Sequence, residues 1–127
     1  MASPTNLELT KKKAASFTTV NLTTGSGNIT YTARTGRPDD GFIFDKFIRV
    51  TPTDGYSMTI TVPDGTYHGQ ELIVLFEAEA SGSTDENVDV TTTTGDDATQ
   101  MSAAGGYWIG RWMGGTIGWV TEDGSAT

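Results

Sequence analysis

The sequence predicts an all-β protein, built as a single antiparallel β-sandwich or barrel of jelly-roll type behind an extended N-terminal arm. Polar and apolar residues alternate over short stretches such as Thr59–Val62. Turn sequences recur at short intervals, and the 127 residues include 16 glycines. Threonine and other β-branched residues stand where a helical protein would carry Ala- and Leu-rich blocks. Together these features are typical of many short strands joined by tight turns.

Composition limits the classes of function. The length suits one domain with one core. The net charge of −8 argues against a general nucleic-acid binder and against an anionic membrane surface, since both attract basic proteins. Without cysteine, the chain has no disulfide framework and no thiolate for catalysis or metal binding. The sequence has no membrane-length apolar run and no signal-peptide pattern, so we expect synthesis in a cytoplasm.

The stretch Thr59–Phe76 organises the predicted domain. Its alternating first part predicts a strand with one wet face, and Pro63-Asp64-Gly65 is turn chemistry. The five apolar residues Leu72–Phe76 have no polar position, so they predict a central strand covered on both sides. Small domains without disulfides often gain stability by oligomerising.

The chain divides into an arm, a β domain and a short polar tail, at residues 1–16, 17–122 and 123–127. Within the arm, Leu7-Glu8-Leu9 alternates and could dock as a short strand on a neighbour. Lys11-Lys12-Lys13 is the one basic cluster of an acidic protein. It is either a solvated surface run or an electrostatic contact with an acidic partner, which would set orientation and association rate.

The predicted strands before the central one begin at Phe17. Phe17–Leu22 and Asn28–Ala33 alternate, with turn residues between them. The loop from Arg34 to Gly41 is rich in breakers and is either solvated or a polar contact site. Phe42–Val50 has two apolar patches around Asp45-Lys46, which predicts a strand interrupted by a turn or bulge.

After the central strand, Asn87–Thr94 predicts a strand with Val88 and Val90 facing inward. Ala98–Ala103 predicts another short strand. Tyr107–Met113 and Thr116–Thr121 predict a hairpin whose two-residue turn is Gly114-Gly115.

All three tryptophans lie in this last hairpin. Trp108 and Trp112 share one face of their strand, while Tyr107 and Arg111 share the other. Aromatic residues on both faces indicate that both are at least partly covered. Three interpretations stay open: core residues, a subunit interface or a sugar-stacking platform. The interface candidates are Tyr107, Trp108, Arg111, Trp112 and Trp119.

We expect no enzyme activity, no cofactor and no metal site. Catalysis needs positioned groups within reach of one another, and the single histidine, His68, lies in a turn without a nucleophile partner. The carboxylates that could form a hydrolytic pair all have turn or surface explanations. The acidic residues near Asp85–Asp89 resemble calcium ligands only in composition, because the EF-hand loop pattern is missing.

One resemblance is specific enough to suggest a function. The C-terminal half, Thr59–Thr121, resembles many small bacteriophage virion proteins in having a turn, a Gly-Gln pair and an apolar strand, followed by a Trp, a small linker and Trp-Val. The matching residues are Pro63, Asp64, Gly65, Gly69, Gln70, Trp112, Gly114, Gly115, Trp119 and Val120. The pattern recurs in capsid decoration (cement) proteins, head fibres and tail-fibre tips.

The resemblance implies a homotrimer on the outer surface of a phage head, seated between subunits of the major capsid protein and stabilising their contacts. The expected capsid contacts in the arm are Leu7, Leu9, Lys11, Lys12 and Lys13. No nucleic acid or membrane partner is expected. The alternative is a head-fibre or tail-fibre tip, an adhesin module that binds host-surface carbohydrate by stacking sugars on Trp108, Trp112 or Trp119.

Overall fold

A computed structural model describes residues 17–24, 27–37, 41–53, 55–79, 86–96 and 101–124 of the chain. These residues form eight β-strands, and no helix occurs among them. The strands are β1 (Phe17–Leu22), β2 (Ile29–Thr32), β3 (Phe44–Val50), β4 (Met58–Val62), β5 (Glu71–Phe76), β6 (Val88–Thr92), β7 (Tyr107–Trp112) and β8 (Trp119–Gly124). The expectation of an all-β protein is confirmed.

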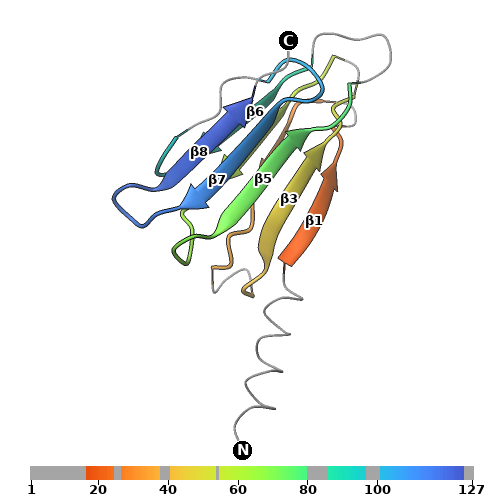
Figure 1. The fold of residues 1–127 in the computed structure, drawn as a ribbon. Helices are drawn as coiled ribbons and strands as arrows, with labels where there is room; N and C mark the ends of the chain where they lie inside the picture. Colours follow the sequence, from red (N-terminus) through yellow and green to blue (C-terminus); the bar gives the residue numbers. More distant parts are fainter. Residues whose placement is uncertain are drawn as a thin grey trace, which may run out of the picture.

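The strands form two sheets that share one core. The larger sheet has the order β1-β3-β5-β7-β8, and the smaller has the order β2-β4-β6. Figure 1 looks onto the larger sheet, with β6 of the smaller sheet behind it. The first six strands therefore alternate between the sheets, and β7 and β8 then complete the larger one.

The expected antiparallel pairing is wrong, and the sheets are not closed into a barrel, which was the alternative to a sandwich. The pairs β1–β3, β3–β5, β2–β4 and β4–β6 are parallel. Only β5–β7 and β7–β8 are antiparallel among the paired strands. The cause lies in the turns, because Pro63-Asp64-Gly65 leads from β4 in one sheet to β5 in the other instead of closing a hairpin. Sheet neighbours are thus two elements apart in the chain and run the same way.

The parallel part is a stack of three coils, each made of one strand from the larger sheet and the next strand from the smaller. The larger-sheet strands of these coils begin at residues 17, 44 and 71, so equal lengths of chain separate them. A repeat is visible in the sequence: Pro38-Asp39-Asp40-Gly41 precedes β3, and Pro63-Asp64-Gly65 precedes β5. Internal repeats of this kind are typical of stacked architectures, and comparing the segments with one another would have found this one.

Individual strands follow the alternation closely. β1 has the predicted bounds, and the register of β1 on β3 shifts beside Asp45 and Lys46, which confirms the predicted bulge. β5 is central in its sheet, but Ile73 and Leu75 on its outer face are only half-buried, so that face is not fully covered.

The last part of the chain departs further from expectation. The two-residue turn at Gly114-Gly115 is wrong, because β7 ends at Trp112 and β8 begins only at Trp119. Backbone bonds from Met113 to Gly118 (2.9 Å) and from Gly118 to Gly114 (2.7 Å) shape the intervening loop. β8 continues to Gly124, past the boundary expected at residue 122. Of the strand expected at Ala98–Ala103, Met101 forms a bridge to Val88, and residues 97–100 lie outside the described part.

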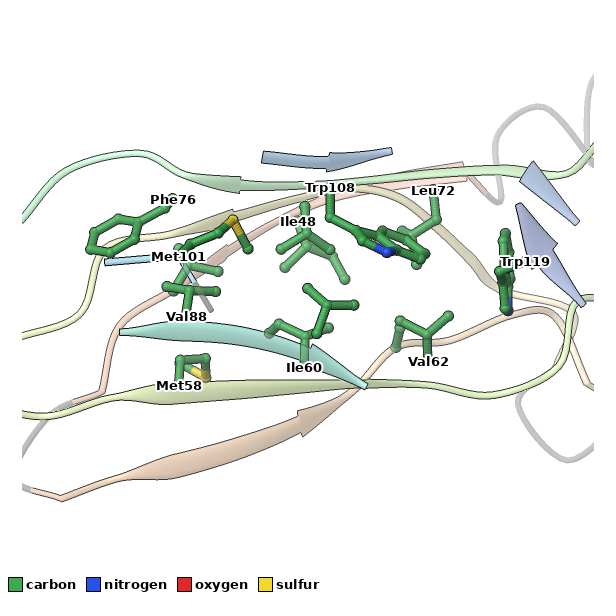
Figure 2. Packing of buried hydrophobic residues seen from close by; sticks show 14 of the residues in the cluster. Ile48, Met58, Ile60, Val62, Leu72, Phe76, Val88, Met101, Trp108 and Trp119 are labelled. Atoms are coloured by element: carbon green, nitrogen blue, oxygen red, sulfur yellow. The ribbon is translucent and has the colours of Figure 1, made fainter. Parts of the chain in front are cut away.

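The core lies between the two sheets. Figure 2 shows Ile48, Leu72 and Trp108 of the larger sheet facing Ile60 and Val62 of the smaller one. Side chains alternate in and out along each strand, as the burial of β4 and β5 shows. The buried hydrophobic residues are Ala33, Ile48, Val50, Met58, Ile60, Val62, Leu72, Val74, Phe76, Val88, Val90, Met101, Trp108, Trp112 and Trp119.

Gly110 makes room for a tryptophan in this core. A Cβ atom at Gly110 would overlap the ring of Trp108, which is fully buried. We expect Gly110→Ala to lower the free energy of unfolding by about 1–3 kcal/mol, the usual effect of overpacking. Gly115→Ala is the matched control, because its Cβ would meet nothing within 4 Å. Equal denaturant midpoints for the two variants would contradict this account.

Candidate functional site

The predicted contact residues fall into three groups. Leu7, Leu9, Lys11, Lys12 and Lys13 of the arm lie outside the described residues. Trp108, Trp112 and Trp119 are core residues with exposed fractions of 0%, 5% and 0%. Their rings are therefore not available to a sugar or a second subunit. Tyr107 is half-buried and Arg111 exposed, and both point away from the core on β7.

The residues of the resembling motif pack together as one unit. The indole N–H of Trp119 donates to the carbonyl of Pro63 at 2.9 Å, and the ring centroids of Trp112 and Trp119 lie 5.5 Å apart. Gly65 lies against Trp112 so closely that a Cβ would overlap the ring. The N–H of Gly69 donates to the carbonyl of Trp112 at 2.8 Å. The motif is thus structural and braces the loops where β5 and β8 begin and β7 ends.

Gln70 completes this unit from inside. It is 2% exposed. Its Oε1 accepts from the N–H of Thr66 at 2.7 Å, and its Nε2 donates to the carbonyl of Thr35 at 3.2 Å. A buried amide needs such partners because an unpaired one is costly. Gln70 therefore joins the loop before β5 to the segment after β2.

The outer face of the larger sheet carries a row of large apolar residues. Strand register places Phe47, Ile73 and Ile109 side by side across β3, β5 and β7. Leu75 and Tyr107 are partners in the next row. All five are half-buried, and no described element crosses in front of this face in Figure 1. We call these five residues the outer apolar row. They are covered by one another and by neighbouring side chains, and they are open to a partner.

Charged pairs border the outer apolar row. Glu71 lies 3.2 Å from Arg111 and 3.7 Å from Lys46, and Arg49 pairs with Glu77 on the side where β3 and β5 end. Exposed pairs of this kind contribute little to stability. An apolar centre with a polar rim is the usual composition of a protein interface.

The outer face of the smaller sheet has the opposite character. Its register rows are Thr30–Thr59–Asp89 and Thr32–Thr61–Thr91. Burial raises the pKa of the Asp89 carboxyl above its usual value. Threonine satisfies the strand preference for β-branched residues while presenting hydroxyls to water. Threonine at such positions is sufficient for the fold. Folding therefore does not explain the large apolar residues on the outer face of the larger sheet.

A second exposed apolar patch lies at the end of the molecule where β3 and β5 begin. Phe42, Tyr67, Met113 and Ile117 are 58%, 43%, 44% and 65% exposed there. We call these four residues the apolar loop end. Phe42 has a φ of 60°, in the left-handed region that disfavours side chains by about 1–2 kcal/mol.

A buried carboxylate ties the edge of the sandwich together near the same end. Asp45 is 2% exposed. It accepts from the Tyr31 hydroxyl at 2.6 Å, the Thr18 hydroxyl at 2.9 Å and the backbone N–H of Arg34 at 2.8 Å. The Arg34 guanidinium lies 2.8 Å away as its ion partner. The bulge that turns Asp45 inward and leaves Lys46 exposed thus joins β1, β2 and β3.

The His, Asp and Glu side chains of the described residues are dispersed with respect to metal binding. No group of three or more His, Asp or Glu side chains placed to hold a metal ion is found among them. His68 is exposed, and its ring lies beside Gly114. Arg34, expected in a solvated loop or a contact site, serves the internal network of Asp45 instead.

A proposal for the function of this chain rests on its geometry and its sequence motif, because comparison with known proteins finds no match. No protein-family model, curated protein or solved structure matches the chain. Within the described ranges, no helix has the length and hydropathy to cross a membrane.

The Asp45 network predicts a pH effect. Burial, followed by the hydrogen bond and the charge of Asp45, raises the pKa of Tyr31 to about 12 from 10. Between these values the phenol ionises first in the unfolded chain, so stability is full below pH 10 and falls as the pH rises toward 12. Tyr31→Phe should show a smaller fall, since Tyr67 still has a pKa raised by burial, and should be destabilised by about 1–3 kcal/mol at pH 7, because Asp45 loses a donor. Urea unfolding at several pH values measures both effects.

Tyr56→Phe is the control for this measurement, since Tyr56 is exposed. Its stability at pH 7 should stay within about 0.5 kcal/mol of the original chain. A Tyr31→Phe protein that shows the same pH profile as the unaltered chain would contradict the role given to Tyr31.

Proposed function

We propose that the chain is a structural virion protein, a capsid decoration protein that binds the outer surface of a phage head as a homotrimer. It works by covering surface and carries out no reaction. The outer apolar row is the observation that supports this most directly, because it provides a subunit interface. The virion assignment comes from the motif resemblance over Thr59–Thr121.

The area of the face falls short of a complete subunit contact. Five strands about 4.8 Å apart and six residues long at about 3.3 Å each give a surface of about 480 Å². A standard interface buries about 800 Å² per partner, so this sheet alone is small for a stable dimer. The proposed trimer therefore also needs contacts outside this face.

The mechanism we propose for capsid stabilisation is bridging. Packaged DNA pushes capsid subunits apart, and a protein bound across their boundary adds interface that must break before they separate. Three copies on one axis multiply weak contacts into a strong one. The fibre-tip alternative required an exposed indole for sugar stacking, and Trp108, Trp112 and Trp119 are all core residues.

The trimer can be tested by replacing isoleucines of the outer apolar row with threonine, the residue that covers the outer face of the smaller sheet. We expect the unaltered chain to sediment as a trimer and the Ile73→Thr, Ile109→Thr variant as a folded monomer. Threonine suits a strand but removes the apolar surface that drives association. Analytical ultracentrifugation measures mass, and circular dichroism checks the fold.

The matched control is Thr59→Ala, Thr61→Ala on the outer face of the smaller sheet, which should leave the mass unchanged. A monomeric unaltered chain at tens of micromolar would count against the trimer. A trimer that survives the Ile73→Thr, Ile109→Thr change would count against this face.

Capsid binding tests the proposed function itself. The intact protein should bind purified DNA-free heads of the virus that encodes it, and should raise the temperature at which those heads come apart. A variant lacking residues 1–13 should bind at least about tenfold more weakly, because the proposed arm contacts are gone. Equal binding by that variant would remove the arm's role, and absence of binding by the intact protein would remove the function.

A further inference from the structure

We propose that the apolar loop end is the surface that docks on the capsid, with Phe42 as its anchor. The partner is a protein surface with an apolar hollow. This inference rests on the proposed function and adds to it which part of the domain makes the contact. The sequence alone gave no signal for it, because its four residues come from three separate loops.

Phe42 is the observation that carries the inference furthest. It combines a φ of 60° with a 58% exposed ring, directly after Gly41 with a φ of 67°. Glycine would satisfy the backbone at position 42, and a polar residue would satisfy the solvent. Phenylalanine suits neither the positive φ nor the exposure to solvent, so folding does not explain the presence of Phe42. Residues held in such conformations cluster at functional sites.

The loops that carry the four residues are contiguous. The ring of Phe44, two residues after Phe42, meets Tyr67 edge-on with centroids 5.7 Å apart. His68, next to Tyr67, lies against Gly114, so a Cβ there would be 3.1 Å from its Nε2. The loop containing Gly114 carries Met113 and Ile117. In Figure 1 these loops lie at the lower end of the larger sheet, where β3 and β5 begin and β7 ends.

The contacts beneath the patch make it rigid. Gly36 lies against Phe44 so closely that a Cβ would overlap the ring, and Gly65 lies equally close to Trp112. Trp119 donates to the carbonyl of Pro63 in the same region. A preorganised apolar surface binds with a smaller loss of conformational entropy than a mobile one. The resembling motif would thus serve to hold this surface in place.

Charge points to the chemistry of the partner. The exposed charges at this end have both signs, Asp64 and Asp96 beside Arg37, Lys46 and Arg111, while the chain as a whole carries a net charge of −8. Nucleic acid and anionic lipid repel a chain with this net charge, which favours a protein surface as the partner.

The attachment point of the arm agrees with this direction. Phe17, the first residue of β1, pairs with Phe44 of β3, so residues 1–16 join the domain at the same end. That segment contains Lys11-Lys12-Lys13 and the two leucines expected to contact the capsid. The chain therefore enters the domain at the end that carries the apolar patch.

The test compares two single variants with a matched control on purified DNA-free heads of the encoding virus. Phe42→Gly should weaken binding at least about tenfold, as truncation of an interface anchor does. Its thermal stability should stay equal or rise, because glycine accepts the positive φ. Ile117→Ser should also weaken binding. Ile29→Ser, which alters a 40% exposed residue at the opposite end of the domain, should bind as the unaltered chain does.

Each outcome decides something. Equal binding by Phe42→Gly and Ile117→Ser overturns the docking surface while the proposed function stands. Absence of binding by the unaltered chain overturns both. Binding of the unaltered chain to neutral phosphatidylcholine vesicles, lost in Phe42→Gly, would show that the patch meets lipid and would overturn the protein partner. A Phe42→Gly protein that binds weakly but is also less stable would overturn the argument from backbone strain.

Discussion

The structure depends on the packing of three indoles between its two sheets. The ring centroids of Trp108 and Trp119 lie 5.9 Å apart, and those of Trp112 and Trp119 lie 5.5 Å apart. The N–H groups of two of them donate to backbone carbonyls, that of Trp119 to Pro63 and that of Trp108 to Asp96. Large aromatic residues with one satisfied polar atom supply apolar burial and fixed direction together. They join the antiparallel strands β7 and β8 to the parallel coils, which is why glycine is needed at Gly65 and Gly110.

Local chemistry in the sequence predicted the strands well and their pairing poorly. Alternation located β1, β4 and β6 because side chains in a strand point to opposite faces whatever the strand pairs with. Pairing is non-local, and Pro63-Asp64-Gly65 has the same composition whether it closes a hairpin or crosses between sheets. The repeat of Pro-Asp and glycine before β3 and β5 was the one signal that distinguished the two. The contact site was harder to predict than the strands, because the sequence around Trp112 is compatible with a core residue and with an interface residue.

The contrast between the two outer faces shows which features the fold requires. Side chains alternate in and out along the strands of both sheets, yet one outer face presents threonine and the other Phe47, Ile73 and Ile109. Strand propensity is satisfied by either set, so it does not explain the difference. The Asp45 network makes the same point from inside, since its donors from β1, β2 and the following loop are all used within the chain. Among the described residues, folding does not account for the outer apolar row or for the apolar loop end.

These two surfaces are suited to different contacts because one lies on a sheet face and the other at the ends of the strands. The outer apolar row faces sideways from the sheet, whereas the apolar loop end lies where β3 and β5 begin, along the strand direction. Under the proposed trimer, packing the sheet faces around an axis along the strands would leave three loop ends free and pointing the same way. Each loop end is small, but linked binding events gain effective concentration and can exceed the single affinity by about 10²–10⁴. A trimer with its strands across the axis would lose that gain, so the proposed capsid contact itself favours strands that run along the axis.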